Sequence, residues 1–187
     1  MAAPAVGRVE VSTPVVADCA GLWRRTLLIG ADGSRDTGTD VQWLQGITAY
    51  VDSRGFAGAL GQNGDIFEWR RDIDLGPPNQ LPDEGSMRWD GRALVETGVH
   101  EDYVEHWVRD TMPTEPGGAL FLTAPDGGNG LLLRVGDLFG WAGAGAVAID
   151  TITSGQWDAL RIELFAEHVE ANGVRWRIEQ REGNVNP

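Results

Sequence analysis

Short runs of alternating polar and apolar residues, most of them built around a tryptophan, follow one another along the chain and are separated by turn signals. Alternation with a period of two residues is typical of β-strands, because successive side chains point to opposite faces. In the strongest run, 103–109, one of the two faces carries Tyr103, Glu105, Trp107 and Arg109. Charged and aromatic side chains that share a face indicate an antiparallel barrel with a partly polar interior.

Turn signals set the limits of the expected strands. Four dipeptides favour tight hairpin turns, namely Asp32-Gly33, Asn63-Gly64, Asp90-Gly91 and Asn172-Gly173. Prolines and glycines in 76–85 and 111–118 predict loops, since proline cannot donate a ladder hydrogen bond. The expected strands cover 22–29, 39–45, 48–54, 66–75, 86–89, 93–97, 103–109, 119–123, 131–135, 138–141, 146–149, 159–169 and 174–180.

The segment 159–168 also fits an amphipathic helix. We favour a strand there, because Leu160, Ile162 and Leu164 alternate with charged or aromatic neighbours and a hairpin signal follows. Strands at this spacing predict a barrel or sandwich of roughly eight to ten strands. We expect an extended N-terminal arm over residues 1–20, where Pro4 and Pro14 interrupt any periodicity, and one domain over residues 21–187.

The two ends of the expected domain resemble a lipocalin-like barrel. Gly21-Leu22-Trp23 opens the first strand, and Arg175 and Arg177 flank Trp176 on the last one. Lipocalin-like barrels use a Gly-x-Trp on the first strand, with an arginine from the last strand packed across the indole. The resemblance implies a single antiparallel lipocalin-like, or calycin-type, barrel.

A second resemblance covers about half of the chain, from Leu22 to Asp110. It is similar to a family of small fungal and bacterial lipocalin-like proteins, whose fungal members were named for interacting with a casein-kinase homologue. This family has no settled biochemical activity, so the resemblance implies the fold and no catalytic residue. The matching pieces are 22–25, 41–45, 50–54, 55–58, 67–71, 83–85 and 96–109.

Charge excludes several classes of partner. The formal net charge is -13 and the 15 basic residues are all arginine, so we expect neither nucleic-acid binding nor a basic membrane contact. The absence of lysine removes Schiff-base chemistry and a Walker-type phosphate loop. No run of apolar residues is long enough to span a bilayer, and no signal peptide is recognisable, so the expected location is the cytoplasm.

Cysteine and histidine suggest no metal centre and no cofactor. Cys19 is the only cysteine, which excludes an internal disulfide and a cysteine metal cluster. The three histidines have no metal-ligand spacing, and we expect surface or packing roles for His106 and His168, with general-base or haem-ligand roles as alternatives. We therefore predict no metal and no bound cofactor.

The leading hypothesis is binding of a small, mostly apolar or aromatic molecule in the barrel, with an anionic or hydrogen-bonding group held by arginine. The rival is a cofactor-independent enzyme, such as a cyclase, isomerase or lyase of secondary metabolism, in which an arginine stabilises an oxyanion. The ligand-binding candidates are Arg54, Arg70, Tyr50, Trp43, Trp69 and Trp107. The catalytic candidates, if the protein is an enzyme, are Glu105, Glu68 and Tyr103.

Two further possibilities stay open. Glu–Arg pairs can instead cross-link neighbouring strands on a solvated face, and the sequence does not show which face is inside. A protein-interaction module with an exposed tryptophan patch is a third function, which a filled barrel would favour. Homodimerisation through an edge strand also remains open.

Overall fold

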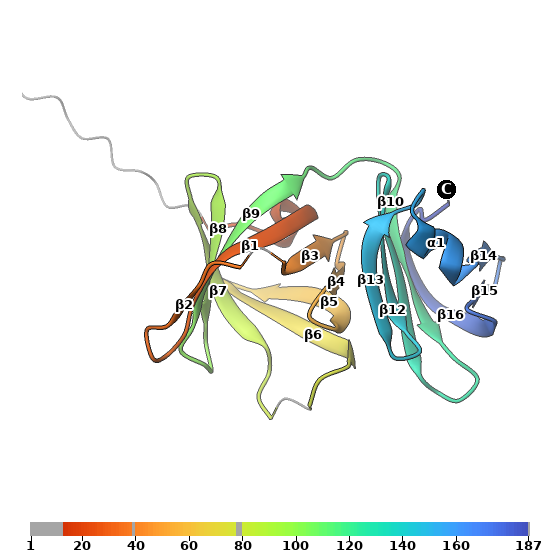
Figure 1. Ribbon diagram of the computed structural model, residues 1–187, viewed down its shortest axis with the longest axis horizontal. Coiled ribbons are helices and arrows are strands. Elements are labelled where there is room, and N and C mark those ends of the chain that lie inside the picture. The colour runs from red at the N-terminus through yellow and green to blue at the C-terminus, as the bar shows by residue number, and fades with distance from the viewer. Residues whose placement is uncertain (1–12, 39, 78–79, 187) are drawn as a thin grey trace, which may run out of the picture.

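Antiparallel strands make up almost all of the regular structure in the computed structural model, which describes residues 13–38, 40–77 and 80–186. The strands form two bodies that lie side by side (Figure 1). The first is a closed barrel built from the N-terminal part of the chain, and the second is an open sheet built from the C-terminal part.

Eight strands close the barrel. Each pairs antiparallel with the next, and β1 pairs with both β3 and β9, which closes the circle. A short strand, β2 (Arg35–Asp36), pairs with the end of β1. The prediction of an antiparallel barrel of roughly eight to ten strands is confirmed. Its strands are β1 (Gly21–Ile29), β3 (Gln42–Gln45), β4 (Ala49–Asp52), β5 (Phe56–Asn63), β6 (Ile66–Asp74), β7 (Glu84–Asp90), β8 (Ala93–Gly98) and β9 (Val104–Thr111).

The strands after Thr111 form the second sheet. The sequence analysis had counted them as strands of one single barrel. Once β1 and β9 pair, no free edge of the barrel remains for the chain after Thr111. Alternation within a strand does not indicate which sheet the strand joins. In spatial order the sheet contains β13 (Ala146–Thr151), β12 (Leu138–Gly143), β11 (Asn129–Val135), β10 (Gly117–Thr123), β16 (Val174–Gly183), β15 (His168–Ala171) and β14 (Glu163–Leu164).

An apolar contact joins the two bodies. Leu44 and Val51 point outward from the barrel and pack in one buried cluster with Leu131 and Leu133 of the second sheet. Gly140 allows a close approach, since a Cβ there would lie 2.8 Å from the Val51 side chain. The outer face of β3–β5 is therefore a core face, and its inner face is left to line the barrel.

The segment predicted as one strand at 159–169 is mostly not a strand. A short helix, α1 (Gly155–Leu160), occupies its beginning, and the Ser154 side chain caps this helix by accepting a hydrogen bond from the Trp157 amide. Arg161 follows with a φ of 49°, which reverses the chain before β14. Ser154 is a typical helix N-cap residue and predicts a helix start. This signal was overlooked because the alternation in 159–168 favoured a strand.

All four predicted hairpin turns are present. The glycine of each, at 33, 64, 91 and 173, has a positive φ, as tight turns require. Residues 1–12 of the predicted arm lie outside the described residues. The part of the arm that is described contains a 3₁₀ helix, η1 (Val16–Cys19), and its Cys19 packs into the barrel core.

Candidate functional site

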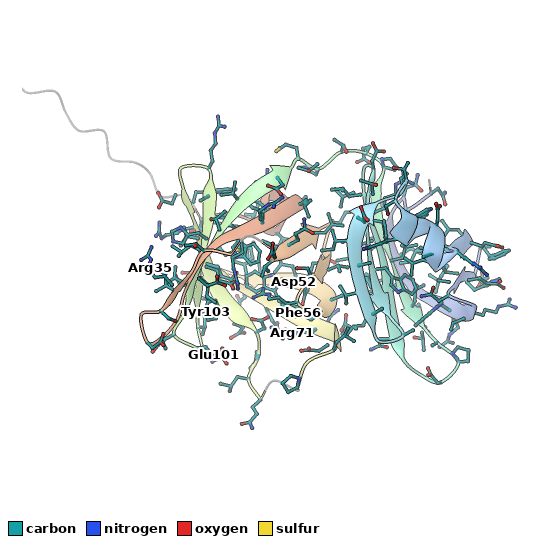
Figure 2. All side chains as sticks on the ribbon, viewed as in Figure 1. Arg35, Asp52, Phe56, Arg71, Glu101 and Tyr103 are labelled. Carbon is teal, nitrogen blue, oxygen red and sulfur yellow. The ribbon has the colours of Figure 1, made fainter. Side chains whose placement is uncertain are left out.

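A cavity of about 970 Å³ opens at one end of the barrel. The barrel is filled by side chains in its other half, where Cys19, Trp23, Phe67, Met87 and Leu94 are almost completely buried. β1 and β6 run from the filled half of the barrel toward the cavity, and β7 and β9 run in the opposite direction. Figure 2 labels four residues that line the cavity, namely Asp52, Phe56, Arg71 and Tyr103.

Tryptophans form the floor of the cavity. Trp43 lies edge-on to both neighbours, with ring centroids 5.9 Å from Trp69 and 5.7 Å from Trp107. Trp43 and Trp107 are each 1% exposed and Trp69 is 6% exposed, so the three rings form a packed aromatic layer at the bottom of the cavity. Edge-on contacts of this kind hold the rings in place.

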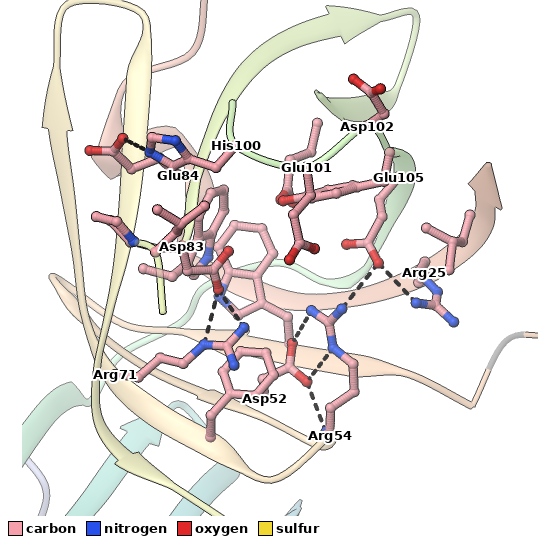
Figure 3. Close-up of a pocket in the computed structure, with 18 of the residues that line it drawn as sticks. Arg25, Asp52, Arg54, Arg71, Asp83, Glu84, His100, Glu101, Asp102 and Glu105 are labelled. Carbon is pink, nitrogen blue, oxygen red and sulfur yellow. Dashed lines mark hydrogen bonds and ion pairs between the residues drawn. The ribbon is translucent and has the colours of Figure 1, made fainter. Parts of the chain in front are cut away.

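Charged side chains form the walls above the tryptophans. Glu105 Oε1 accepts hydrogen bonds from Arg25 Nη1 at 2.8 Å and from Arg54 Nη1 at 3.0 Å. Arg54 also holds Asp52 through two further bonds of 2.8 and 3.0 Å, so its guanidinium lies between the two carboxylates (Figure 3). Burial alone would lower the pKa of Arg54, but Asp52 and Glu105 outweigh that effect and raise it.

Arg25 adds a second ion pair and one unpaired donor. Its Nη2 donates to Asp36 at 2.9 Å, so that Asp36 and Glu105 share the guanidinium. Its Nε–H is buried and has no acceptor among the described residues. A hydrogen-bond acceptor on a bound molecule would satisfy such a donor.

Glu96 is the buried carboxyl opposite Glu105. The two residues are direct partners in the β8–β9 register, and both side chains line the cavity. Tyr103 Oη donates to Glu96 Oε1 at 2.7 Å, and Trp107 Nε1 donates to Glu96 Oε2 at 3.1 Å. Burial, and then the charge of Glu105, raises the pKa of Glu96 to about 8, so Glu96 carries a proton at neutral pH.

A β-bulge follows the third arginine of the cavity on β6. The β5–β6 register slips between Ala57 and Gly58, which leaves Asp72 without a partner. Arg71 precedes the slip and faces inward, where it pairs with Asp83 at 2.7 Å and Asp74 at 3.0 Å. After the slip, Ile73, which regular alternation would place on the inner face of β6, points outward and packs against the second sheet.

The balance of charge in the cavity lining is negative. Three arginines line the cavity, and each is already held by two carboxylates. At the mouth, His100 Nε2 lies 2.8 Å from Glu84. Leu28, Leu81 and Pro82 add apolar surface there. The carboxyl groups of the lining belong to Asp52, Asp83, Glu84, Glu96, Glu101, Asp102 and Glu105.

Six of the predicted site residues line this cavity. They are Glu105, Tyr103, Arg54, Trp43, Trp69 and Trp107. Burial and the Glu96 carboxyl raise the pKa of Tyr103, because its phenol is partly buried and donates to that group.

Three predicted residues lie elsewhere. Glu68 and Arg70 are on the exposed outer face of β6, where Arg70 pairs with Asp72 at 3.1 Å. The inner face of this strand belongs to Trp69 and its alternate neighbours, so a prediction that used Trp69 together with Arg70 mixed two faces. Tyr50 points inward but is fully buried beneath the cavity, and its pKa is raised by burial.

The sequence analysis did not select Glu96, Arg25, Asp52 and Arg71. Asp52 and Arg25 had usable signals, since they alternate with Tyr50 and with Trp23 on their strands. The signal for Glu96 was its position opposite Glu105, which requires the strand register.

An arginine does pack across Trp23, as the resemblance to lipocalin-like barrels implied, but it is Arg109. Its guanidinium carbon lies 4.4 Å from the ring centroid, and Arg109 belongs to β9, the strand that closes the barrel. Arg175 and Arg177 lie on β16 in the second sheet.

Other chemistry finds no support among the described residues. They contain no group of three or more histidine, cysteine or acidic side chains placed to hold a metal ion. No helix in the described ranges is long and apolar enough to cross a membrane. Burial, and then Asp18, raises the pKa of Cys19 to about 12, which keeps the thiol protonated and unreactive.

No protein-family model and no curated protein matches the chain. Among solved structures, it is similar to the crystal structure of an uncharacterised protein from Saccharomyces cerevisiae. The TM-score is 0.55 and the identity 13%, and the match covers 86% of this chain and 98% of the yeast chain. At this identity the likeness concerns the fold, and it extends over both the barrel and the second sheet.

Proposed function

We propose that the protein binds a small, mostly apolar or aromatic molecule in the barrel cavity. The observation that carries the proposal is a cavity of about 970 Å³ with an aromatic floor and buried charged groups in its walls. Ligand pockets typically enclose about 300–1,000 Å³ and combine apolar surface with a few placed polar groups. The resemblance to lipocalin-like proteins, whose barrels enclose ligands, supports the same function.

The buried charges support a binding role over a structural one. Glu105 is 3% exposed and Glu96 is 5% exposed, and placing two carboxyl groups opposite each other costs stability. Apolar residues fill the other half of the same barrel. Perturbed titratable groups that line a cavity are typical of functional sites. A protein-interaction module would be favoured by a filled barrel, and this barrel is open.

A neutral fluorescent probe tests the proposal. N-phenyl-1-naphthylamine has no charge at neutral pH, and its emission rises in an apolar site. Ala31 is an exposed turn residue at the cavity mouth, so Ala31→Trp places a large side chain there without altering the core. The matched control is Ala166→Trp, at an exposed position in the connection between β14 and β15.

We expect the probe to bind the wild-type protein and the Ala166→Trp variant equally, and the Ala31→Trp variant at least about tenfold more weakly, the equivalent of about 1.4 kcal/mol. Absence of binding, or equal binding by all three proteins, would contradict a ligand site in the barrel.

Proton transfer is a second candidate function, and the protonated Glu96 beside Tyr103 is the observation that favours it. An acid with a pKa near the working pH is suited to general acid–base catalysis. Glu96 then takes the role that the sequence analysis assigned to Glu105, which two guanidinium groups hold. In the test, native mass spectrometry of the purified protein first identifies any small molecule that it retains, and deuterium exchange from D₂O into that molecule is then measured. A catalytic Glu96 predicts exchange that Glu96→Gln abolishes, and a binding protein predicts none.

Two expectations about partners remain predictions. We expect neither nucleic acid nor anionic lipid as a partner, because both require a basic surface and the formal net charge is -13. Homodimerisation through an edge strand would use β13 or β14, the two edges of the second sheet.

A further inference from the structure

We propose that the cavity selects an organic cation, an amine or quaternary ammonium with an apolar or aromatic part, over neutral and anionic molecules of the same shape. This inference rests on the proposed binding function and adds the chemical class of the ligand. It departs from the expectation that an arginine would hold an anionic group.

The arginines are not available to an anion. Arg25, Arg54 and Arg71 each contact two carboxylates, at 2.7–3.0 Å. An anion would have to displace one of these carboxylates, and the displaced group would remain in the same negative cavity. The free Nε–H of Arg25 can serve a neutral acceptor, such as a hydroxyl or carbonyl, without any free positive charge.

The carboxyl groups, by contrast, still have oxygen atoms that can pair with a cation. Glu105 uses Oε1 for both arginines, and no hydrogen bond from the described residues reaches its Oε2. Glu96 receives only neutral donors, the Tyr103 hydroxyl and the Trp107 indole. At the mouth, Glu101 and Asp102 form no ion pair with any described residue. An entering cation therefore meets the carboxyl groups of Glu101 and Asp102 at the mouth and the free Oε2 of Glu105 deeper in the cavity. Glu96 joins them when it gives up its proton.

The cavity already stabilises cations of its own. The Arg71 guanidinium carbon lies 3.7 Å from the Phe56 ring centroid, and that of Arg54 lies 5.0 Å from Phe56 and 5.6 Å from Trp107. Aromatic faces and carboxylates together are the environment in which proteins hold guanidinium and quaternary ammonium groups.

A proton on Glu96 links cation binding to pH. A bound cation favours the charged carboxylate, so binding releases this proton, and affinity rises as the pH rises toward 9. Below about pH 7 the proton must be removed at a cost, and affinity falls. The groups that face Glu96 are Tyr103, Trp107 and Glu105 on β9, Asp83 before β7 and Arg54 after β4.

The experiment compares probes of one shape and three charges. Benzyltrimethylammonium, neopentylbenzene (carbon in place of nitrogen) and phenylmethanesulfonate each compete with bound N-phenyl-1-naphthylamine at pH 6 and pH 9. The proteins are the wild type, Glu96→Gln, and Glu68→Gln as a matched control on the outer face of β6. Binding of the neutral fluorescent probe reports that each variant is folded with an open cavity.

We expect the wild type at pH 9 to bind the cation at least about tenfold more tightly than the neutral isostere, and the anion more weakly than either. At pH 6 this preference shrinks severalfold. Glu96→Gln retains the fluorescent probe and loses the pH dependence, while Glu68→Gln behaves as wild type.

Equal affinity for the cation and its isostere, or a preference that Glu96→Gln leaves pH-dependent, overturns the inference while the binding function stands. Failure of the fluorescent probe to bind the wild-type protein overturns the proposed function and this inference with it.

Discussion

Glu105 is the residue on which the charged contacts of the cavity converge. Its side chain is 4% exposed, and one of its oxygens joins Arg25 on β1 to Arg54 after β4. A buried ion pair contributes little net stability, but removing one partner leaves the other charge uncompensated. Glu96 lies on the neighbouring strand, and burial raises its pKa so that it keeps its proton.

Replacing Glu105 with glutamine leaves the buried Arg25 with Asp36 alone, and Asp36 is half exposed. We expect Glu105→Gln to lower the free energy of unfolding by about 2 kcal/mol, less than the full cost of a broken buried pair because Asp36 still pairs with Arg25. Glu68→Gln on the exposed face should change it by less than about 0.5 kcal/mol. Urea denaturation at pH 7 measures both, and equal losses would show that Glu105 is not the centre of the network.

Glu96 predicts a pH dependence of stability. Its pKa rises from 4.5 to about 8 on folding, so the folded protein binds more protons than the unfolded chain between these values. Stability from this group is complete below pH 4.5 and is lost as the pH rises to about 8, by up to ~1.4 kcal/mol per pH unit. Relative to the wild type, Glu96→Gln should become more stable from pH 5 to pH 8. A difference that is flat or falls over this range, in denaturation curves at each pH, would contradict a protonated Glu96.

The β5–β6 hairpin sets which side chains of β6 reach the cavity. Before the bulge, Phe67, Trp69 and Arg71 face inward, and after it Ile73 packs outward against the second sheet. Gly58 makes the bulge possible, because a Cβ there would lie 1.9 Å from the Arg70 carbonyl oxygen.

Gly58→Ala should therefore cost at least about 2 kcal/mol of stability, since backbone atoms cannot move aside cheaply. Gly61→Ala is the matched control in the same strand, because the nearest atom to its added Cβ is 4.0 Å away. Thermal unfolding followed by circular dichroism compares the two. Similar melting temperatures would mean that the bulge is not held by Gly58.

Patterns within single strands and turns explain which features the sequence predicted correctly and which features it did not predict. Alternation located seven of the eight barrel strands, all except β5, and the three floor tryptophans, and the dipeptide turns located four hairpins. Alternation alone does not orient a strand, so Arg70 was chosen where Arg71 lines the cavity. Glu96 became a site residue only through its partner Glu105 across the β8–β9 hairpin, because alternation within either strand does not give the register between them.

At the scale of the whole molecule, the second sheet supports the barrel wall that carries Asp52 and Arg54. Leu44 and Val51 on the outside of that wall pack with Leu133, which is fully buried. The net charge of -13 extends the negative character of the cavity over the molecule. Such a field attracts cations, and salt weakens it.

Leu133→Ala leaves a void between the two bodies, and we expect it to lower the free energy of unfolding by about 3 kcal/mol. Because the contact supports the cavity wall, loss of N-phenyl-1-naphthylamine binding should coincide with loss of circular dichroism during urea unfolding. Val108→Ala, at a side chain that is 38% exposed, should cost less than about 1 kcal/mol. A second sheet that melts while the probe stays bound would show that the barrel does not depend on it.

The most direct test of a cation-binding barrel is a crystal structure of the wild-type protein grown with benzyltrimethylammonium at pH 9. The account predicts density for the cation inside the cavity, with its nitrogen within about 4–6 Å of the Glu96 or Glu105 carboxylate and its ring toward Trp69. A cavity closed by its own side chains, or a cation bound only outside the barrel, would contradict it.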